Sequence, residues 1–298
     1  MSEPRYIDPL PLGGEGIPFS KGLMARALIA TGMTGVRAYE LARRVDADLA
    51  ETGETAVEIE RMREVAVEML GEQEGGQAMR RLMRYADLRQ LELPIVLLVG
   101  GATGTGKSTI ATDVAYRLGI SRVTSTDFVR QTMRAFFSRE FMPSVHYSSF
   151  EAGQAVSGVT AERVIPGFLE QTRNVLVGVS AAIDRALEEG WSIVLEGVHL
   201  VPGMLPAAFE RAALVQCVLH IEDAEAHARH FWVRDAASDG TRKLDKYLEG
   251  FDDIRAIQDF IVERARQAGV AVIENANIDN ALGEVMDLVF AEIERMQE

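Results

Sequence analysis

The sequence lacks the features that mark secreted and membrane proteins. It contains 1 cysteine, Cys217, so no disulfide can form within the chain. No apolar run reaches the roughly 18 residues that a membrane-spanning helix needs. Residues 1–5 (Met-Ser-Glu-Pro-Arg) do not open a hydrophobic signal segment. We therefore expect a cytoplasmic protein that has no membrane partner.

Positive charge is also scarce. The 298 residues include 31 lysines and arginines against 45 aspartates and glutamates, which gives a net charge of −14. So acidic a chain is a poor binder of nucleic acid, and we expect no nucleic-acid partner. A site for a polyphosphate must therefore gather its few cations locally. The sequence does not determine the oligomeric state; a homo-oligomer is compatible with it.

One stretch, PIVLLVGGATGTGKST at residues 94–109, carries the clearest signal. Its apolar residues Ile95–Val99 predict a buried strand, and Gly101 to Ser108 follow the pattern G-x-x-x-x-G-K-[ST] of a phosphate-binding loop. Glycines let backbone N–H groups approach phosphate oxygens, and the next helix points its positive end at the same anion. We predict that ATP binds to Gly101, Ala102, Thr103, Gly104, Thr105, Gly106, Lys107, Ser108 and Thr109.

The sequence has different periodicities before and after this loop. Apolar residues at helical spacing predict helices at 19–30, 36–50, 57–70 and 77–89. From Ile95 onward, apolar runs alternate with helical stretches, and the later runs lie at 120–124, 192–195, 214–221 and 270–273. We predict an α/β fold with a P-loop NTPase-type parallel five-stranded sheet flanked by helices, preceded by a small all-α domain. The expected domains are 1–92 and 93–298.

Ligands of a parallel sheet bind beyond the carboxyl ends of its strands. After the second predicted strand come Asp127, Arg130 and Arg134. The carboxylate can orient or deprotonate a hydroxyl and the arginines can bind an anion, or else Asp127 caps a helix and both arginines are solvated. After the third strand, Glu196 can hold Mg²⁺ through a water. His199 can contact a substrate or be an ordinary turn histidine.

Two further segments have the composition of substrate-covering elements. Residues 139–150 (REFMPSVHYSSF) include His146 and Tyr147, and they can close over a small polar substrate or form a plain surface loop. After the fourth strand, Arg229 and Arg234 predict a lid that neutralises charge during phosphoryl transfer. The alternative for these arginines is a solvated helix face.

Several segments resemble the 2-phosphoglycerate kinase family. They are GGATGTGKST (100–109), STDFVRQTMR (125–134), HYSSF (146–150), VLEGVHLVPG (194–203), KYLEGFDDIRAIQDFIVERA (246–265) and VIENANID (272–279). The first motif is shared by a very large superfamily, whereas HYSSF and EGVHLVPG are much more specific. The resemblance implies a kinase that transfers the γ-phosphoryl group of ATP to the 3-hydroxyl of 2-phosphoglycerate, giving 2,3-bisphosphoglycerate.

Residues and resemblance together give one assignment of roles, with ATP and Mg²⁺ as the cofactors and a small anionic substrate as the partner. The residues expected to take part in catalysis are Lys107, Asp127, Arg229 and Arg234. The residues expected to bind the acceptor are Asp127, Arg130, Arg134, His146, Tyr147 and His199. The residues expected to hold the metal are Ser108 and Glu196.

The first domain is similar to a second known module. Residues 17–32 and 38–49 resemble the ATP-cone regulatory module, and Lys21 matches the lysine with which that module contacts phosphate. The basic stretch that normally opens the module is missing from residues 6–16. Without nucleotide binding, the plain expectation for this domain is packing or dimerisation.

Two other functional classes stay open. One is a P-loop kinase for a different anionic acceptor, such as an inositol phosphate, a sugar acid or a nucleotide. The other is an ATP-dependent regulator without catalysis. The combination of Asp127, Arg130, Arg134 and Glu196 argues against a regulator, because a pure sensor has no use for an acceptor site.

Overall fold

The computed structural model describes residues 19–53, 57, 59–90, 93–156, 163–206, 208–209, 212–237 and 244–297, without the side chains of 84–90, 233–237 and 297. The chain divides into two compact units, Met1–Glu92 and Leu93–Glu298. Within the described residues, no helix combines the length and the apolar character needed to cross a membrane.

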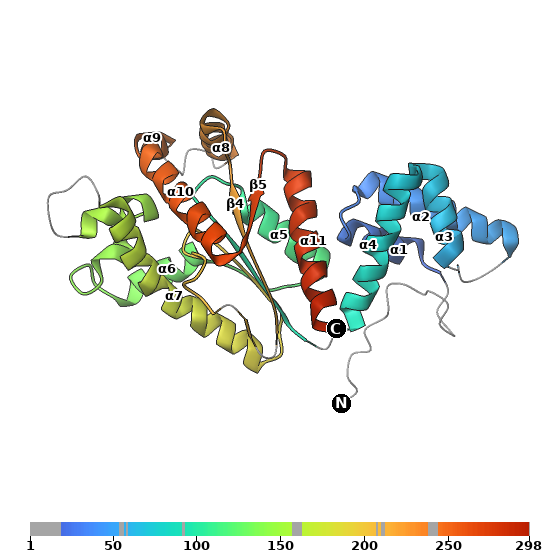
Figure 1. Cartoon of the computed structure of the whole chain (residues 1–298), viewed down its shortest axis with the longest axis horizontal. Coiled ribbons are helices and arrows are strands. Elements are labelled where there is room, and N and C mark those ends of the chain that lie inside the picture. The colour runs from blue at the N-terminus through green and yellow to red at the C-terminus, as the bar shows by residue number, and fades with distance from the viewer. Residues whose placement is uncertain are drawn as a thin grey trace. The chain divides into compact units, whose positions relative to one another are not determined.

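The first unit is helical. Its described helices are α1 (Lys21–Ala30), α2 (Gly35–Thr52), α3 (Ile59–Leu70) and α4 (Glu72–Gln90) (Figure 1). The hydroxyl of Ser20 caps α1 by accepting from the backbone N–H of Leu23. Gly75 lets α4 approach α3 closely, because a Cβ there would lie 2.6 Å from the carbonyl oxygen of Ala66. The unit buries an apolar core of its own, which includes Leu28, Leu41, Val45, Met62 and Leu82.

The second unit is built on a five-stranded parallel sheet. Its strands are β1 (Ile95–Gly101), β2 (Val123–Ser125), β3 (Ile193–Glu196), β4 (Ala213–His220) and β5 (Ala271–Glu274), in the order β2-β3-β1-β4-β5. This sheet confirms the predicted α/β fold class. The second strand begins later than predicted, because Gly119 ends the preceding helix in a left-handed conformation and Ile120 still bonds back to that helix.

Helices cover both faces of the sheet. Two of them, α5 (Lys107–Leu118) and α11 (Ile278–Gln297), pack together on one face, and α7 (Val164–Glu188) and α10 (Phe251–Ala268) pack together on the other (Figure 1). The other α-helices among the described residues of this unit are α6 (Thr126–Phe136), α8 (Ala224–Ala237) and α9 (Leu244–Glu249). The sequence analysis missed α9 and the two 3₁₀ helices Pro143–His146 and Ser149–Ala155, which are too short for a periodic apolar face.

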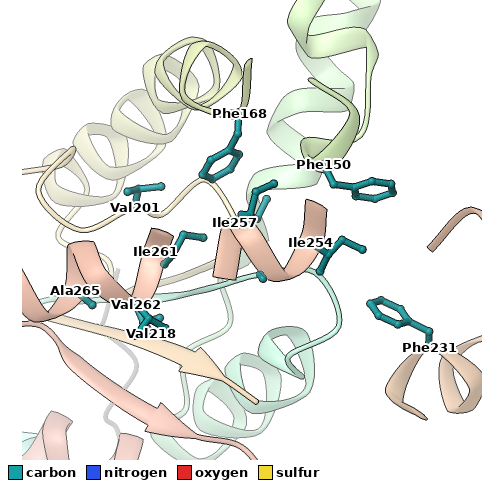
Figure 2. Packing of buried hydrophobic residues seen from close by; sticks show 12 residues of the cluster. Phe150, Phe168, Val201, Val218, Phe231, Ile254, Ile257, Ile261, Val262 and Ala265 are labelled. Atoms are coloured by element: carbon teal, nitrogen blue, oxygen red, sulfur yellow. The ribbon is translucent and has the colours of Figure 1, made fainter. Parts of the chain in front are cut away.

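A hydrophobic cluster joins these layers. Ile254, Ile257 and Ile261 of α10 belong to one cluster with Phe168 of α7 and Phe231 of α8 (Figure 2). Each of these side chains is at most 1 % exposed. The cluster therefore connects α8 to the helices that cover the sheet.

We expect Phe168→Ala to lower the free energy of unfolding of the second unit by about 3–5 kcal/mol, because it leaves a cavity in a closed core. Both tryptophans, Trp191 and Trp232, lie in this unit, so their fluorescence during urea unfolding reports on it. The matched control is Phe136→Ala, at a side chain that is 79 % exposed. Equal losses in the two variants would contradict the assignment of the core.

Candidate active site

The glycine-rich segment forms a turn from β1 into α5 whose positions 101, 104 and 106 have no room for a side chain. Gly101, Gly104 and Gly106 have φ angles of +135°, +89° and +82°, in the region that favours glycine. A Cβ on Gly101 would overlap the backbone of β4. Helix α5 begins at the next residue, Lys107, so its positive end faces whatever the turn encloses.

Lys107 is the cation of this turn. It is 8 % exposed, and its Nζ donates to the carbonyl oxygen of Ala102 at 2.5 Å. Burial lowers the pKa of Lys107, whereas the carboxylates of Glu196 and Asp127 raise it by a smaller amount. The net lowering means that the charged ammonium is poorly solvated, so an anion placed beside it would interact strongly.

A cleft of about 120 Å³ joins the ends of three strands. Its lining comes from the turn after β1, from β2 and α6, and from the end of β3; it includes Thr103, Gly104, Lys107, Ser108, Ser125, Asp127, Glu196 and Gly197. The hydroxyl of Ser108 donates to Oε1 of Glu196 at 3.0 Å. Ser108 is exposed and Glu196 is buried, and a hydroxyl and a carboxylate are oxygen ligands of the kind that Mg²⁺ uses. The donor set therefore fits this metal.

Asp127 reaches the same cleft from α6. Its side chain is 67 % exposed, and it does not cap the helix, because the hydroxyl of Ser125 accepts from the N–H of Phe128 at 3.0 Å. Burial raises the pKa of Asp127, but Arg130, His199 and Lys107 together lower it by more. The carboxylate is therefore ionised at neutral pH and free to accept a hydrogen bond from a ligand hydroxyl.

The two arginines of α6 do not act as a pair. Arg130 is 7 % exposed, and its Nη1 donates to the carbonyl oxygens of Val145 at 3.0 Å and Tyr147 at 2.8 Å, while its Nε donates to Asp127 at 3.2 Å. Arg134 is exposed and donates to Gln131 at 3.1 Å. The two guanidinium groups thus differ both in burial and in their partners. The guanidinium of Arg130 therefore donates to two backbone carbonyl oxygens and to the carboxylate of Asp127.

His199 is fully buried, which corrects the prediction that it faces a substrate. Its Nε2 donates to Oε1 of Gln171 at 2.9 Å, and its Nδ1 accepts from the hydroxyl of Thr126 at 2.8 Å. Burial lowers its pKa to about 4, so the ring is neutral. Gln171 also donates to the carbonyl oxygen of Ser144 at 2.6 Å. No sequence pattern indicated Gln171, because it lies within α7.

The segment at 139–150 is hydrogen-bonded to α6, to α7 and to the residues just before it. The Nε2 of His146 donates to the carbonyl oxygen of Phe137 at 2.9 Å. The guanidinium carbon Cζ of Arg139 lies over the ring of Tyr147, 5.0 Å from the ring centre. Neither His146 nor Tyr147 is among the residues that line the cleft.

The lid arginines are only partly described. Arg229 is an exposed residue of α8, and Arg234 lies in the same helix with its side chain outside the described residues. A connection that the sequence did not predict is the ion pair between Lys246 of α9 and Glu151, at 2.5 Å. The sequence also gave no role to His227, which donates from α8 to the carbonyl oxygen of Thr103 at 2.8 Å.

Comparisons with known proteins place the chain among named enzymes. No model of a known protein family matches it. The 2-phosphoglycerate kinase of Pyrococcus furiosus is 35 % identical, with 91 % of this chain and 89 % of that protein aligned. The proteins of the same name from Methanothermobacter thermautotrophicus and Thermococcus kodakarensis are 37 % and 34 % identical, and cover 90 % and 94 % of this chain. The alignments span 89 % and 95 % of those two proteins.

The buried histidines predict how stability depends on pH. Burial lowers the pKa of both His199 and His227 from 6.5 to about 4. Between pH 6.5 and about pH 4, these histidines take up protons in the unfolded chain but not in the folded protein. The contribution of each histidine to the free energy of unfolding is therefore full above pH 6.5 and is lost as the pH falls towards 4. In urea unfolding, we expect His227→Gln to flatten this decline by at most about 1.4 kcal/mol per pH unit. An unchanged slope would contradict this.

Proposed function

The chain belongs to the 2-phosphoglycerate kinase family, and on that premise we propose how its residues transfer the γ-phosphoryl group of ATP to the 3-hydroxyl of 2-phosphoglycerate. The product is 2,3-bisphosphoglycerate. The observation that carries the proposal is the convergence of Lys107, Ser108, Asp127 and Glu196 on one cleft at the strand ends. A kinase needs a phosphate cradle, metal ligands and an acceptor carboxylate in one place, and these four residues supply them.

ATP binds with its phosphates in the turn at 101–109. Lys107 leaves the carbonyl of Ala102 and contacts the β- and γ-phosphates, where its poorly solvated charge stabilises the transferring group. Ser108 and Glu196 would hold Mg²⁺, Glu196 through a water, and the ion supplies neutralisation of phosphate charge.

The acceptor binds on the α6 side of the cleft. Asp127 orients the 3-hydroxyl and accepts its proton as the new bond from that oxygen to the γ-phosphorus forms and the bond to the β-phosphate oxygen breaks, releasing ADP. The acceptor carries a carboxylate and a phosphate, about three negative charges in all. Arg134 is the exposed cation on the same helix for these groups, and Arg229 and Arg234 of α8 neutralise charge on the phosphoryl group as it is transferred.

Arg130, His146, Tyr147 and His199 act on the acceptor indirectly. Arg130 fixes the carboxylate of Asp127 and the backbone of residues 145–147 at the same time. His199 with Gln171 ties the same segment to the end of β3. These contacts set the wall of the acceptor site and leave the direct contacts to Asp127 and Arg134.

The two domains of the proposal are the helical residues 1–92 and the kinase residues 93–298, in agreement with the two compact units. In the helical domain, Lys21 pairs with Asp46 at 3.0 Å, so nucleotide must compete with a carboxylate for that lysine. Nucleotide binding by an ATP-cone-like module stays a prediction.

The first experiment measures ATP consumption by the purified protein with Mg²⁺ and a panel of acceptors. The panel holds 2-phosphoglycerate, 3-phosphoglycerate, glycerate, inositol phosphates and nucleoside monophosphates. We expect turnover with 2-phosphoglycerate alone, because the chain belongs to the family of kinases named for that acceptor. Turnover with another member alone would keep the site and change the substrate. Inactivity with every member, together with ATP binding, would favour a regulator.

Two substitutions separate the halves of the site. We expect Lys107→Ala to lower turnover at least ~10²-fold and to weaken ATP binding, because the lysine contacts the phosphates before and during transfer. We expect Asp127→Asn to lower kcat ~10²–10³-fold with little change in the KM for ATP, because it removes the proton acceptor alone. Steady-state kinetics distinguish the two effects.

The matched control is Asp184→Asn, at an exposed position of α7, and it should retain wild-type kinetics. Normal activity in Lys107→Ala would overturn the site, and an effect of Asp127→Asn on ATP affinity alone would overturn the acceptor assignment.

A further inference from the structure

Three side chains hold consecutive carbonyl groups of the glycine-rich turn from outside. Nε2 of His227 donates to the carbonyl oxygen of Thr103 at 2.8 Å, and Nδ1 of His230 donates to that of Gly104 at 3.0 Å. Nδ2 of Asn275, at the end of β5, donates to the carbonyl oxygen of Thr105 at 2.9 Å. None of the three belongs to the phosphate-binding motif, and the roles proposed above do not use them.

Each of these bonds fixes the direction of a backbone N–H group. The peptide unit is planar, and the chain has no cis peptide in the described residues, so each C=O and the N–H of the following residue point in opposite directions. The N–H groups of Gly104, Thr105 and Gly106 therefore point away from the two imidazoles and the amide. We propose that His227, His230 and Asn275 are positioning residues that aim these three donors at the phosphates of the nucleotide.

The packing around the turn supports this role. A Cβ on Gly104 would lie 2.6 Å from Cζ of Phe231 and 3.1 Å from Nε2 of His227, so α8 rests directly on the turn. Phe231 stacks on Tyr247 with ring centres 5.1 Å apart and belongs to the cluster that holds α10 (Figure 2). The imidazole of His227 is therefore carried on a helix anchored in the core.

Packing alone does not explain a histidine at position 227. The side chain is fully buried, and its Nδ1 has no hydrogen-bond partner in the described structure. An unpaired buried nitrogen lowers stability, and a leucine would fill similar space without that loss. What the imidazole adds is the single N–H that it directs at Thr103.

This inference rests on the proposed nucleotide site, and the experiment is built so that the two can fail separately. His227 donates from Nε2 and His230 from Nδ1, and these atoms lie at different distances from the backbone. The amide nitrogen of glutamine reaches about as far as Nε2, and that of asparagine about as far as Nδ1. The rescuing variants are therefore His227→Gln and His230→Asn. Their counterparts without a donor are His227→Leu and His230→Leu.

The measurement is the dissociation constant of ADP and of AMP for each variant by titration calorimetry, with a thermal melt to confirm folding. ADP adds the β-phosphate, which the backbone of such a loop cradles. We expect the leucine variants to bind ADP ~10-fold more weakly, the loss of about one hydrogen bond, with AMP affinity within ~2-fold of wild type. The rescuing variants should bind ADP as wild type does, and the KM for the acceptor should not change.

The outcomes separate the two ideas. Failure of the wild-type protein to bind ADP would overturn the proposed nucleotide site. Normal ADP binding by folded His230→Leu, a half-buried position that tolerates substitution better than 227, would overturn the positioning role. Equal losses for ADP and AMP, or equal losses in the leucine and amide variants, would also overturn it, because a purely structural role does not distinguish phosphate number or a donor.

Discussion

The rest of the second unit depends on one constraint, the path of the backbone from β1 into α5. A phosphate group can be bound by main-chain N–H groups only where the chain turns sharply and carries no side chains in the way. A Cβ on Gly101 would contact the backbone of β4, one on Gly104 would contact Phe231 and one on Gly106 would contact Asn275. The turn is therefore enclosed on three sides. The sheet order places β1 at the centre, between β3 and β4, and the turn therefore opens at the middle of the edge where the strands end.

The electrostatic problem of this protein is to hold anions in an acidic chain. With a net charge of −14, the long-range field repels ATP and phosphorylated acceptors alike. Binding must come from short-range groups, where low solvation makes each charge and dipole count for more. Buried Lys107 and the start of α5 are such groups. The carboxylates of Asp127 and Glu196 in the same cleft already accept hydrogen bonds, from Arg130 and from the hydroxyl of Ser108 respectively.

The sequence predicted the features that depend on residues close together in the chain, and it did not predict contacts between residues far apart in the chain. The turn motif specifies its shape through adjacent residues, and the alternation of strands and helices specifies the parallel sheet, so both could be predicted. Glu196 and Asp127 were found because parallel strands end at one edge. The partners of Arg130 could not be predicted, since spacing gives the helix face but not the distant carbonyls of Val145 and Tyr147 that the guanidinium meets. Gln171 has no local signature at all.

Arg130, Gln171 and His227, which sequence reasoning missed or assigned differently, share one property. Arg130 and Gln171 donate to backbone carbonyls of residues 144–147, and His227 does the same for the glycine-rich turn. A polar side chain buried against a carbonyl satisfies its own desolvation cost and fixes a peptide plane at the same time. Polar residues near a site therefore divide into those that contact ligand and those that give the backbone its direction. Arg130, Gln171 and His227 are buried against the carbonyl groups that they hold, whereas Asp127 and Arg134, which we propose as the residues that contact the acceptor, are exposed.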